Sequence, residues 1–139
     1  MTTSSRDVVI VGGGIVSCLT GYLLGRNGFK VTILEADSVG SHASGFAFGG
    51  LDPLTGVGLP EPLLEFSLWC YGRHRTLTRE LQEQTGIDVG FELRDRLHLA
   101  FEDEEVREDK ANVDWMRTVG GFNVEWVDRD QAMKLEPQV

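Results

Sequence analysis

Hydrophobic residues open the chain in a pattern that predicts two strands separated by a helix. Residues 7–11 form a continuous apolar run, and residues 29–35 form a second run rich in β-branched side chains. Runs of this kind are typical of parallel strands covered on both faces. Between them apolar residues recur at helical spacing, and Gly28 can end that helix as a left-handed cap. We therefore expect a βαβ unit, complete by residue 35, with an apolar helical stripe made of Ile15, Cys18, Leu19, Tyr22 and Leu23.

Small residues dominate the next segment, residues 40–58, in which six glycines are interleaved with serine and alanine. Neither strand nor helix periodicity persists there. Loops of this length are uncommon in compact domains and are usually functional or disordered. Because the segment also contains Phe46, Phe48, Leu51 and Leu54, we expect an ordered loop with a functional role.

The rest of the chain predicts helices and short strands. Three helices are expected: a long one from Pro62 to Gly86, an acidic one over about 103–119, and a last one from an Asp128 cap to Pro137. Alternating apolar and polar residues predict strands over 91–101 and 122–127. The fold class is α/β, a Rossmann-type βαβ unit followed by the start of an α+β domain. A sheet of two parallel strands leaves edges unpaired, so we expect an incomplete domain.

Composition narrows the classes of function. The chain has 139 residues and a formal net charge of −9, which disfavours nucleic acid and anionic membrane surfaces as partners. Its apolar runs fall short of the roughly 20 residues that span a bilayer. Its start lacks the basic region of a signal peptide, so a cytoplasmic location is expected. Cys18 and Cys70 share no metal-ligand spacing with a histidine, and no metal site is expected.

A glycine triplet lies where a dinucleotide-binding turn belongs, directly after the first strand and at the start of the helix. Gly12 would permit the tight turn, and Gly14 would let backbone approach a pyrophosphate that the helix N-terminus attracts. Ser17 occupies the place of the usual third glycine. Because Gly21 and Gly25 follow it at intervals of four residues, a face of small residues remains for close packing on the strands.

Glu35 ends the second strand, twenty-three residues after Gly12. An acidic residue there accepts hydrogen bonds from the ribose hydroxyls of a dinucleotide and disfavours a 2′-phosphate. The alternative is an ordinary strand–helix turn with a solvated glutamate, but strand, helical stripe and Glu35 together favour dinucleotide binding. The motif alone does not separate NAD from FAD.

Further runs carry a family resemblance: residues 8–16, 31–36, 40–45 with 49–51, 97–100 and 132–137. Together they resemble the D-amino-acid oxidase-like flavoproteins, a family that includes glycine and sarcosine oxidases. Ser17 and the pair Asp95-Arg96 depart from the family pattern, which usually has glycine at those places. The resemblance implies FAD as the cofactor. The cofactor-binding residues that it implies are Gly12, Gly14, Ile15 and Val16 at the pyrophosphate, Glu35 and Ala36 at the adenosine ribose, and Ala43, Ser44, Phe48, Gly49 and Gly50 along the pyrophosphate and isoalloxazine.

The resemblance also implies a domain plan and an activity. Residues 1–50 would begin the FAD-binding domain, 51–87 would form a loop and the long helix, and 88–139 would begin a substrate domain. The enzyme would oxidise an amine or amino acid by hydride transfer to the flavin, and water would hydrolyse the resulting imine. We expect the substrate-positioning residues in the remainder of the enzyme or a partner chain, so no catalytic residue is assigned. Two alternatives stay open: a nicotinamide-dependent dehydrogenase, and a non-catalytic cofactor-binding subunit or fragment.

His42 directly precedes the Ala43-Ser44-Gly45 run. In the dimethylglycine and sarcosine dehydrogenase branch of the family, a histidine at the equivalent place carries the flavin covalently, whereas many other members bind FAD noncovalently. This chain lacks the tryptophan that usually lies beside that histidine. We therefore favour a polar loop residue near the pyrophosphate over a covalent flavin attachment.

Overall fold

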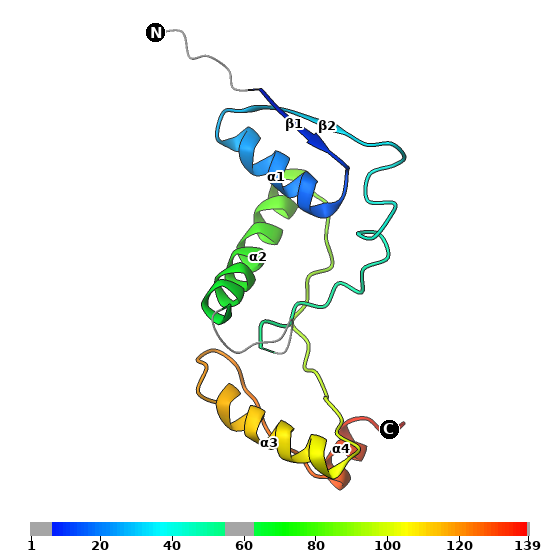
Figure 1. Ribbon diagram of the computed structural model, residues 1–139, viewed down its shortest axis with the longest axis vertical. Coiled ribbons are helices and arrows are strands. Elements are labelled where there is room, and N and C mark those ends of the chain that lie inside the picture. Colours follow the sequence, from blue (N-terminus) through cyan, green and yellow to red (C-terminus); the bar gives the residue numbers. More distant parts are fainter. Residues whose placement is uncertain (1–6, 55–62, 139) are drawn as a thin grey trace. The chain divides into compact units, whose positions relative to one another are not determined.

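The computed structural model describes residues 7–54 and 63–138 (Figure 1). The chain divides into two compact units, Met1–Gly50 and Leu51–Val139. The described part of the first unit contains two strands and a helix, and that of the second contains three helices. This composition confirms the predicted α/β class.

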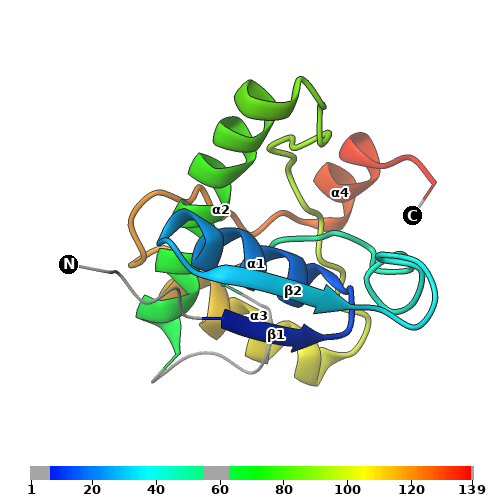
Figure 2. The same ribbon diagram turned by 90° about the horizontal axis from the view of Figure 1, so that it is seen from above.

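The first unit contains the predicted βαβ motif. Strand β1 (Asp7–Val11) is followed by helix α1 (Ile15–Arg26) and strand β2 (Lys30–Leu34). The two strands are parallel and pair along their full length. Figure 2 shows them side by side, with α1 against them. Gly28 lies just beyond α1 at φ 83°, the left-handed conformation expected of a residue that ends a helix.

Gly21 is the small residue that lets α1 approach the strands. It is buried, and a Cβ atom at this position would lie 3.1 Å from Cδ1 of Ile33 and 3.5 Å from Cγ1 of Val31. A Cβ atom at Gly25 would meet nothing within 4 Å. The small-residue face of α1 therefore approaches the strands closely at Gly21, its central residue. It does not require a glycine at Ser17.

Only one face of the two strands is covered within the first unit. Val8 and Ile10 are half-buried, whereas Val9 and Val11 are 62% and 83% exposed. Helix α1 is the one described helix of this unit and packs on a single face, so the covering of both faces stays a prediction for the intact protein. The apolar stripe of α1 is likewise half-buried at its centre and exposed at both ends.

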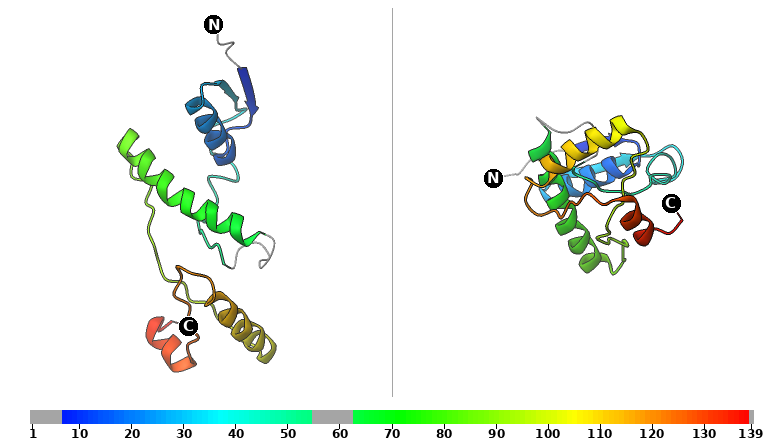
Figure 3. Two further views of the ribbon diagram at one scale, coloured as in Figure 1. Left: turned by 90° about the vertical axis from the view of Figure 1, so that its left-hand side faces the viewer. Right: turned by 90° about the horizontal axis from the view of Figure 1, so that it is seen from below.

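The second unit contains helices α2 (Leu64–Thr85), α3 (Asp103–Met116) and α4 (Arg129–Leu135). Helix α2 is one continuous helix (Figure 3), and Gly86 ends it in the left-handed conformation, as predicted. The predicted start at Pro62 lies outside the described residues. Within the described ranges, no helix has the length and apolar character needed to cross a membrane.

A capping box at Asp128 fixes the start of α4. The Asp128 carboxylate accepts a hydrogen bond from the backbone N–H of Gln131 at 2.9 Å, and the Gln131 side chain accepts one from the backbone N–H of Asp128. This arrangement satisfies N–H groups that have no partner inside the helix. The predicted cap is therefore confirmed.

The predicted strands over 91–101 and 122–127 are wrong, because neither segment is a strand in the structure. Both segments instead contact helices of the same unit. Phe91 lies 5.7 Å from His74 on α2 between ring centroids, and Lys110 on α3 lies 5.0 Å from the ring centroid of Trp126. Alternating apolar and polar residues suit an extended segment beside a helix as well as a strand. A strand additionally needs a hydrogen-bonded neighbour, and the one sheet of the described residues consists of β1 and β2.

Candidate cofactor-binding site

The glycine triplet forms the turn between β1 and α1. Gly12 has φ 99°, a conformation that residues with a side chain rarely adopt, and its N–H donates to the carbonyl oxygen of Leu34 at 2.7 Å. Gly14 is the N-cap of α1 and has no side chain with which to cap the helix. The first turn of α1 carries no acidic residue of its own. This turn has the backbone geometry that an anion-binding helix N-terminus requires.

Glu35, the first residue after β2, is bound to this turn through its side chain. Its Oε2 accepts a hydrogen bond from the backbone N–H of Gly13, and its Oε1 accepts one from the backbone N–H of Asp37 at 3.0 Å. These hydrogen bonds, that of Asp37 first and that of Gly13 second, hold the pKa of the Glu35 carboxyl below its ordinary value. Each carboxylate oxygen can accept a second hydrogen bond, so the ribose hydroxyls of a ligand can still bind here.

The small-residue loop after β2 folds back onto the start of α1. The Ser44 hydroxyl oxygen accepts a hydrogen bond from the backbone N–H of Ile15 at 2.9 Å. The backbone N–H of Gly40 donates to the carbonyl oxygen of Gly13 at 3.0 Å. A Cβ atom at Gly45 would collide with the carbonyl oxygen of Gly40, so this tight turn of the loop needs a glycine. The loop is therefore ordered as far as these contacts extend, which agrees with the expectation of order.

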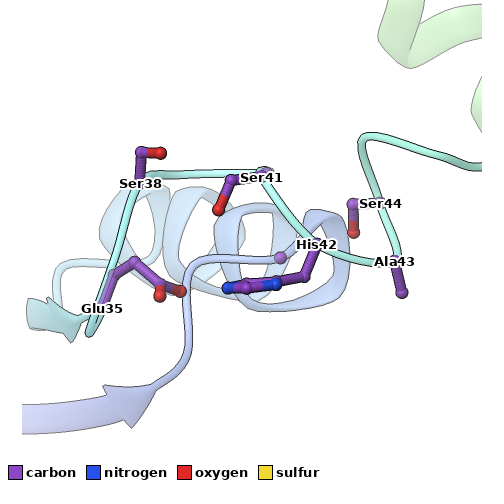
Figure 4. A pocket seen from close by; sticks show the side chains of 8 residues that line it. Glu35, Ser38, Ser41, His42, Ala43 and Ser44 are labelled. Carbon is purple, nitrogen blue, oxygen red and sulfur yellow. The ribbon is translucent and has the colours of Figure 1, made fainter.

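A pocket of about 150 Å³ lies where the loop meets the glycine turn. Figure 4 shows the side chains around it, and its lining consists of Gly14, Gly40, Glu35, Ser38, Ser41, His42, Ala43 and Ser44. Pockets that enclose a whole drug-sized ligand have roughly 300–1,000 Å³. This pocket therefore suits one polar part of a dinucleotide, such as the diphosphate with the adjoining ribose.

His42 extends across this pocket toward Glu35 (Figure 4). Its Nε2 lies 3.5 Å from Oδ2 of Asp37, and the Ser41 hydroxyl donates to the same carboxylate oxygen at 3.5 Å. The His42 and Asp37 side chains are 74% and 64% exposed, so solvent screens their ion pair strongly. Asp37 thus contacts Glu35 through its backbone and His42 through its side chain.

The structure brings together some of the predicted site residues and leaves others apart. Gly14, Glu35, His42, Ala43 and Ser44 line one pocket. The other predicted residues are not part of its lining: Gly12, Ile15 and Val16 belong to the adjoining turn and helix start, Ala36 directly follows Glu35, and Phe48, Gly49 and Gly50 lie further along the loop. Their roles toward a cofactor stay predictions.

Gly13 and Asp37 are important contacts of the site that the sequence did not single out. Gly13 is buried, and a Cβ atom there would lie 3.0 Å from Oε2 of Glu35, a tight contact to which the Glu35 side chain would have to adjust. The position of Gly13 inside the glycine triplet could have indicated this contact from the sequence. Asp37 gave no comparable signal, because its contacts arise only when the loop turns back toward the strand.

Comparison with known protein families identifies the chain. A family model described as FAD dependent oxidoreductase (DAO) matches residues 7–139. The chain is 31% identical over 137 residues to a glycine oxidase from Geobacillus kaustophilus, and this match covers 99% of the chain and 36% of that protein. It is 30% identical to an opine oxidase subunit from Rhizobium meliloti, with 94% of the chain and 36% of that protein covered.

A solved structure agrees with these sequence matches. The crystal structure of glycine oxidase from Geobacillus kaustophilus matches 97% of the chain with a TM-score of 0.86 at 32% identity. The chain spans 36% of the length of that protein. The family match resolves the choice between the two dinucleotides that the motif left open, and it confirms FAD as the cofactor of the family. The chain belongs to the DAO family of FAD-dependent oxidoreductases.

Proposed function

We propose that this chain supplies the diphosphate and ribose part of the FAD site in an enzyme that oxidises an amino acid or amine. The observation that carries the proposal is the pocket in which Glu35, the glycine turn and the Ser44 loop meet. Similarity to glycine oxidases over nearly the whole chain supports the substrate class. Because the chain spans 36% of the length of these relatives, the activity itself belongs to the proposal.

The residues of the site fit the polar half of FAD. Glu35 offers carboxylate oxygens to ribose hydroxyls, and the start of α1 offers its N–H groups and dipole to a diphosphate. The backbone N–H of Ile15 donates a hydrogen bond to the Ser44 hydroxyl oxygen. A phosphate oxygen in the place of this hydroxyl could accept the same hydrogen bond. Gly12 has a positive φ that residues with side chains rarely adopt, and a side chain at Gly13 would crowd Glu35.

The chemistry of the reaction divides between cofactor and protein. FAD, when bound, accepts a hydride from the carbon that bears the amino group. The described residues bind and orient the cofactor at its adenosine end, and we assign none of them a catalytic role. The residues that place the substrate carbon and exclude water belong to other parts of the intact enzyme.

The test is purification of the intact protein followed by cofactor and activity analysis. We expect a yellow protein that releases FAD rather than FMN, because Glu35 and the glycine turn serve only a ligand with a ribose and a diphosphate. Glycine, sarcosine and D-alanine should be assayed with oxygen and with an artificial electron acceptor. Release of FMN would overturn the cofactor assignment, and bound FAD without turnover of any amine would overturn the substrate class.

A second candidate is a cofactor-binding subunit that works with a partner chain. The observation that favours it is the 30% identity to a protein named as one subunit of an opine oxidase. Gel filtration of the intact protein alone and with the product of the neighbouring gene separates the two cases. Amine turnover by the isolated protein supports the first candidate, whereas turnover only in a larger complex supports the second.

A further inference from the structure

We propose that His42 is a protonatable ligand of the FAD diphosphate, and that it makes the affinity for FAD rise as the pH falls. The proposal rests on the proposed function, since it requires the diphosphate of FAD to enter the pocket lined by Glu35, His42 and Ser44. It goes beyond that function by assigning a role to a side chain that the glycine and glutamate motif does not include.

The charges around the pocket are the first argument. His42 is the one side chain of the pocket lining that can carry a positive charge, and Glu35 carries a negative charge. Asp37, which pairs with His42, adds a second negative charge. A diphosphate would bring two more, so with a neutral imidazole the described lining would offset them with the N-terminus of α1 and the hydroxyls of the loop alone. Protonation of His42 therefore favours the bound state.

The position of the imidazole is the second argument. Figure 4 shows His42 and Glu35 pointing toward one another across the glycine turn. The ring is held loosely, since its Nε2 lies 3.5 Å from the Asp37 carboxylate and the side chain is 74% exposed. The ring can therefore rotate toward a ligand in the pocket without loss of packing. Without a ligand, the contact with the Asp37 carboxylate keeps the His42 ring near the pocket.

The FAD affinity should depend on pH because protonation of His42 and binding of FAD favour one another. The charged groups that face His42 are Glu35 and Asp37 from the segment after β2, and the first turn of α1 contributes no acidic residue. Among protein side chains, histidine is the one whose change of charge ordinarily falls between about pH 5 and 8, whereas carboxyl groups ordinarily titrate at lower pH. If FAD binds the protonated form more tightly, binding takes up a proton and affinity rises toward acidic pH. Discounted for exposure, the expected gain is roughly three- to ten-fold.

The experiment measures FAD affinity of the intact protein, after removal of its cofactor, by equilibrium dialysis at pH 5.5 and pH 8. We expect wild type to bind FAD roughly three- to ten-fold more tightly at pH 5.5. His42→Gln should show little difference between the two pH values, and His42→Lys, with its permanent charge, should bind tightly at both. His98→Gln is the matched control, because His98 forms a similar pair with Asp109 at 3.3 Å and does not line the pocket.

Each outcome decides the proposal. An equal affinity of wild type at the two pH values, or the same pH response in His42→Gln as in wild type, would overturn it while leaving the FAD site intact. Flavin that stays attached to the acid-precipitated protein through His42 would overturn it too, because an alkylated ring no longer acts as a free ligand. Absence of FAD binding at both pH values would overturn the proposed function and this proposal with it.

Discussion

The Glu35 carboxylate accepts a hydrogen bond from the backbone N–H of Gly13, which precedes it by twenty-two positions. This contact joins the end of β2 to the turn that follows β1. A glycine at position 13 leaves room for the contact, because a Cβ atom would lie 3.2 Å from Cβ and Cγ of Glu35. Glu35 therefore joins the glycine turn to the end of β2, and in the proposed site its remaining lone pairs would also bind a ribose.

Replacement of Glu35 by alanine should weaken FAD binding about ten- to a hundred-fold, the range for hydrogen bonds to a charged group. Glu35→Gln should lose less, because the amide oxygen can still accept from Gly13 or Asp37. Flavin fluorescence titration of the intact protein measures both. Glu125→Ala, an exposed glutamate of the second unit, serves as the control and should leave the affinity unchanged. An unaltered affinity in Glu35→Ala would mean that the ribose binds elsewhere.

Replacement of Gly21 or Gly25 in α1 by a large residue should change the stability of the protein in opposite directions. Gly21→Leu should destabilise the protein by about 1–3 kcal/mol, because Ile33 lies 3.1 Å from the position of the new Cβ atom. Gly25→Leu has open space and a better helix former, so stability should stay the same or rise by up to about 1 kcal/mol. Denaturant unfolding of the intact protein compares the two. Similar losses in both variants would show that α1 does not pack closely at Gly21.

The local patterns of the first unit could be predicted because each depends on neighbours in sequence. The apolar runs at β1 and β2, and the left-handed glycine at Gly28, follow from the residues at those places. The position of Glu35 directly after β2 brought it to the glycine turn, since parallel strands end at the same edge of a sheet. These features needed no knowledge of the rest of the chain.

Features that depend on distant partners could not be predicted in the same way. The segments 91–101 and 122–127 alternate like strands, but pairing is a property of two segments, and these contact helices instead. The exposure of one face of β1 in the described residues has a related reason, because periodicity reports the preference of a face and not the presence of a covering element. The pairing of Asp37 with His42 depends on the exact path of a glycine-rich loop, which composition does not determine.

The lowered pKa of Glu35 predicts how the stability of the first unit depends on pH. A carboxyl whose folded-state pKa is lowered stabilises the fold at pH values above its unfolded pKa, about 4.3 for glutamate. That contribution is lost as the pH falls through the folded pKa. The difference in melting temperature between wild type and Glu35→Gln should be constant between pH 5.5 and 7.5 and shrink below pH 4. A difference that persists unchanged at low pH would show that the hydrogen bonds to Gly13 and Asp37 do not favour the ionised form.

FAD should be bound noncovalently, although His42 lies in the small-residue loop after β2. A histidine can attack a flavin methyl carbon only if a neutral ring nitrogen is aimed at it. His42 instead lines the pocket of Glu35 and Gly14, which suits the ribose and diphosphate, and the isoalloxazine is at the far end of FAD from the adenosine. Acid precipitation of the intact protein should therefore leave all flavin in the supernatant, for wild type and for His42→Ala alike. Yellow flavin in the wild-type pellet that is missing from the His42→Ala pellet would contradict this and place the ring methyl beside His42.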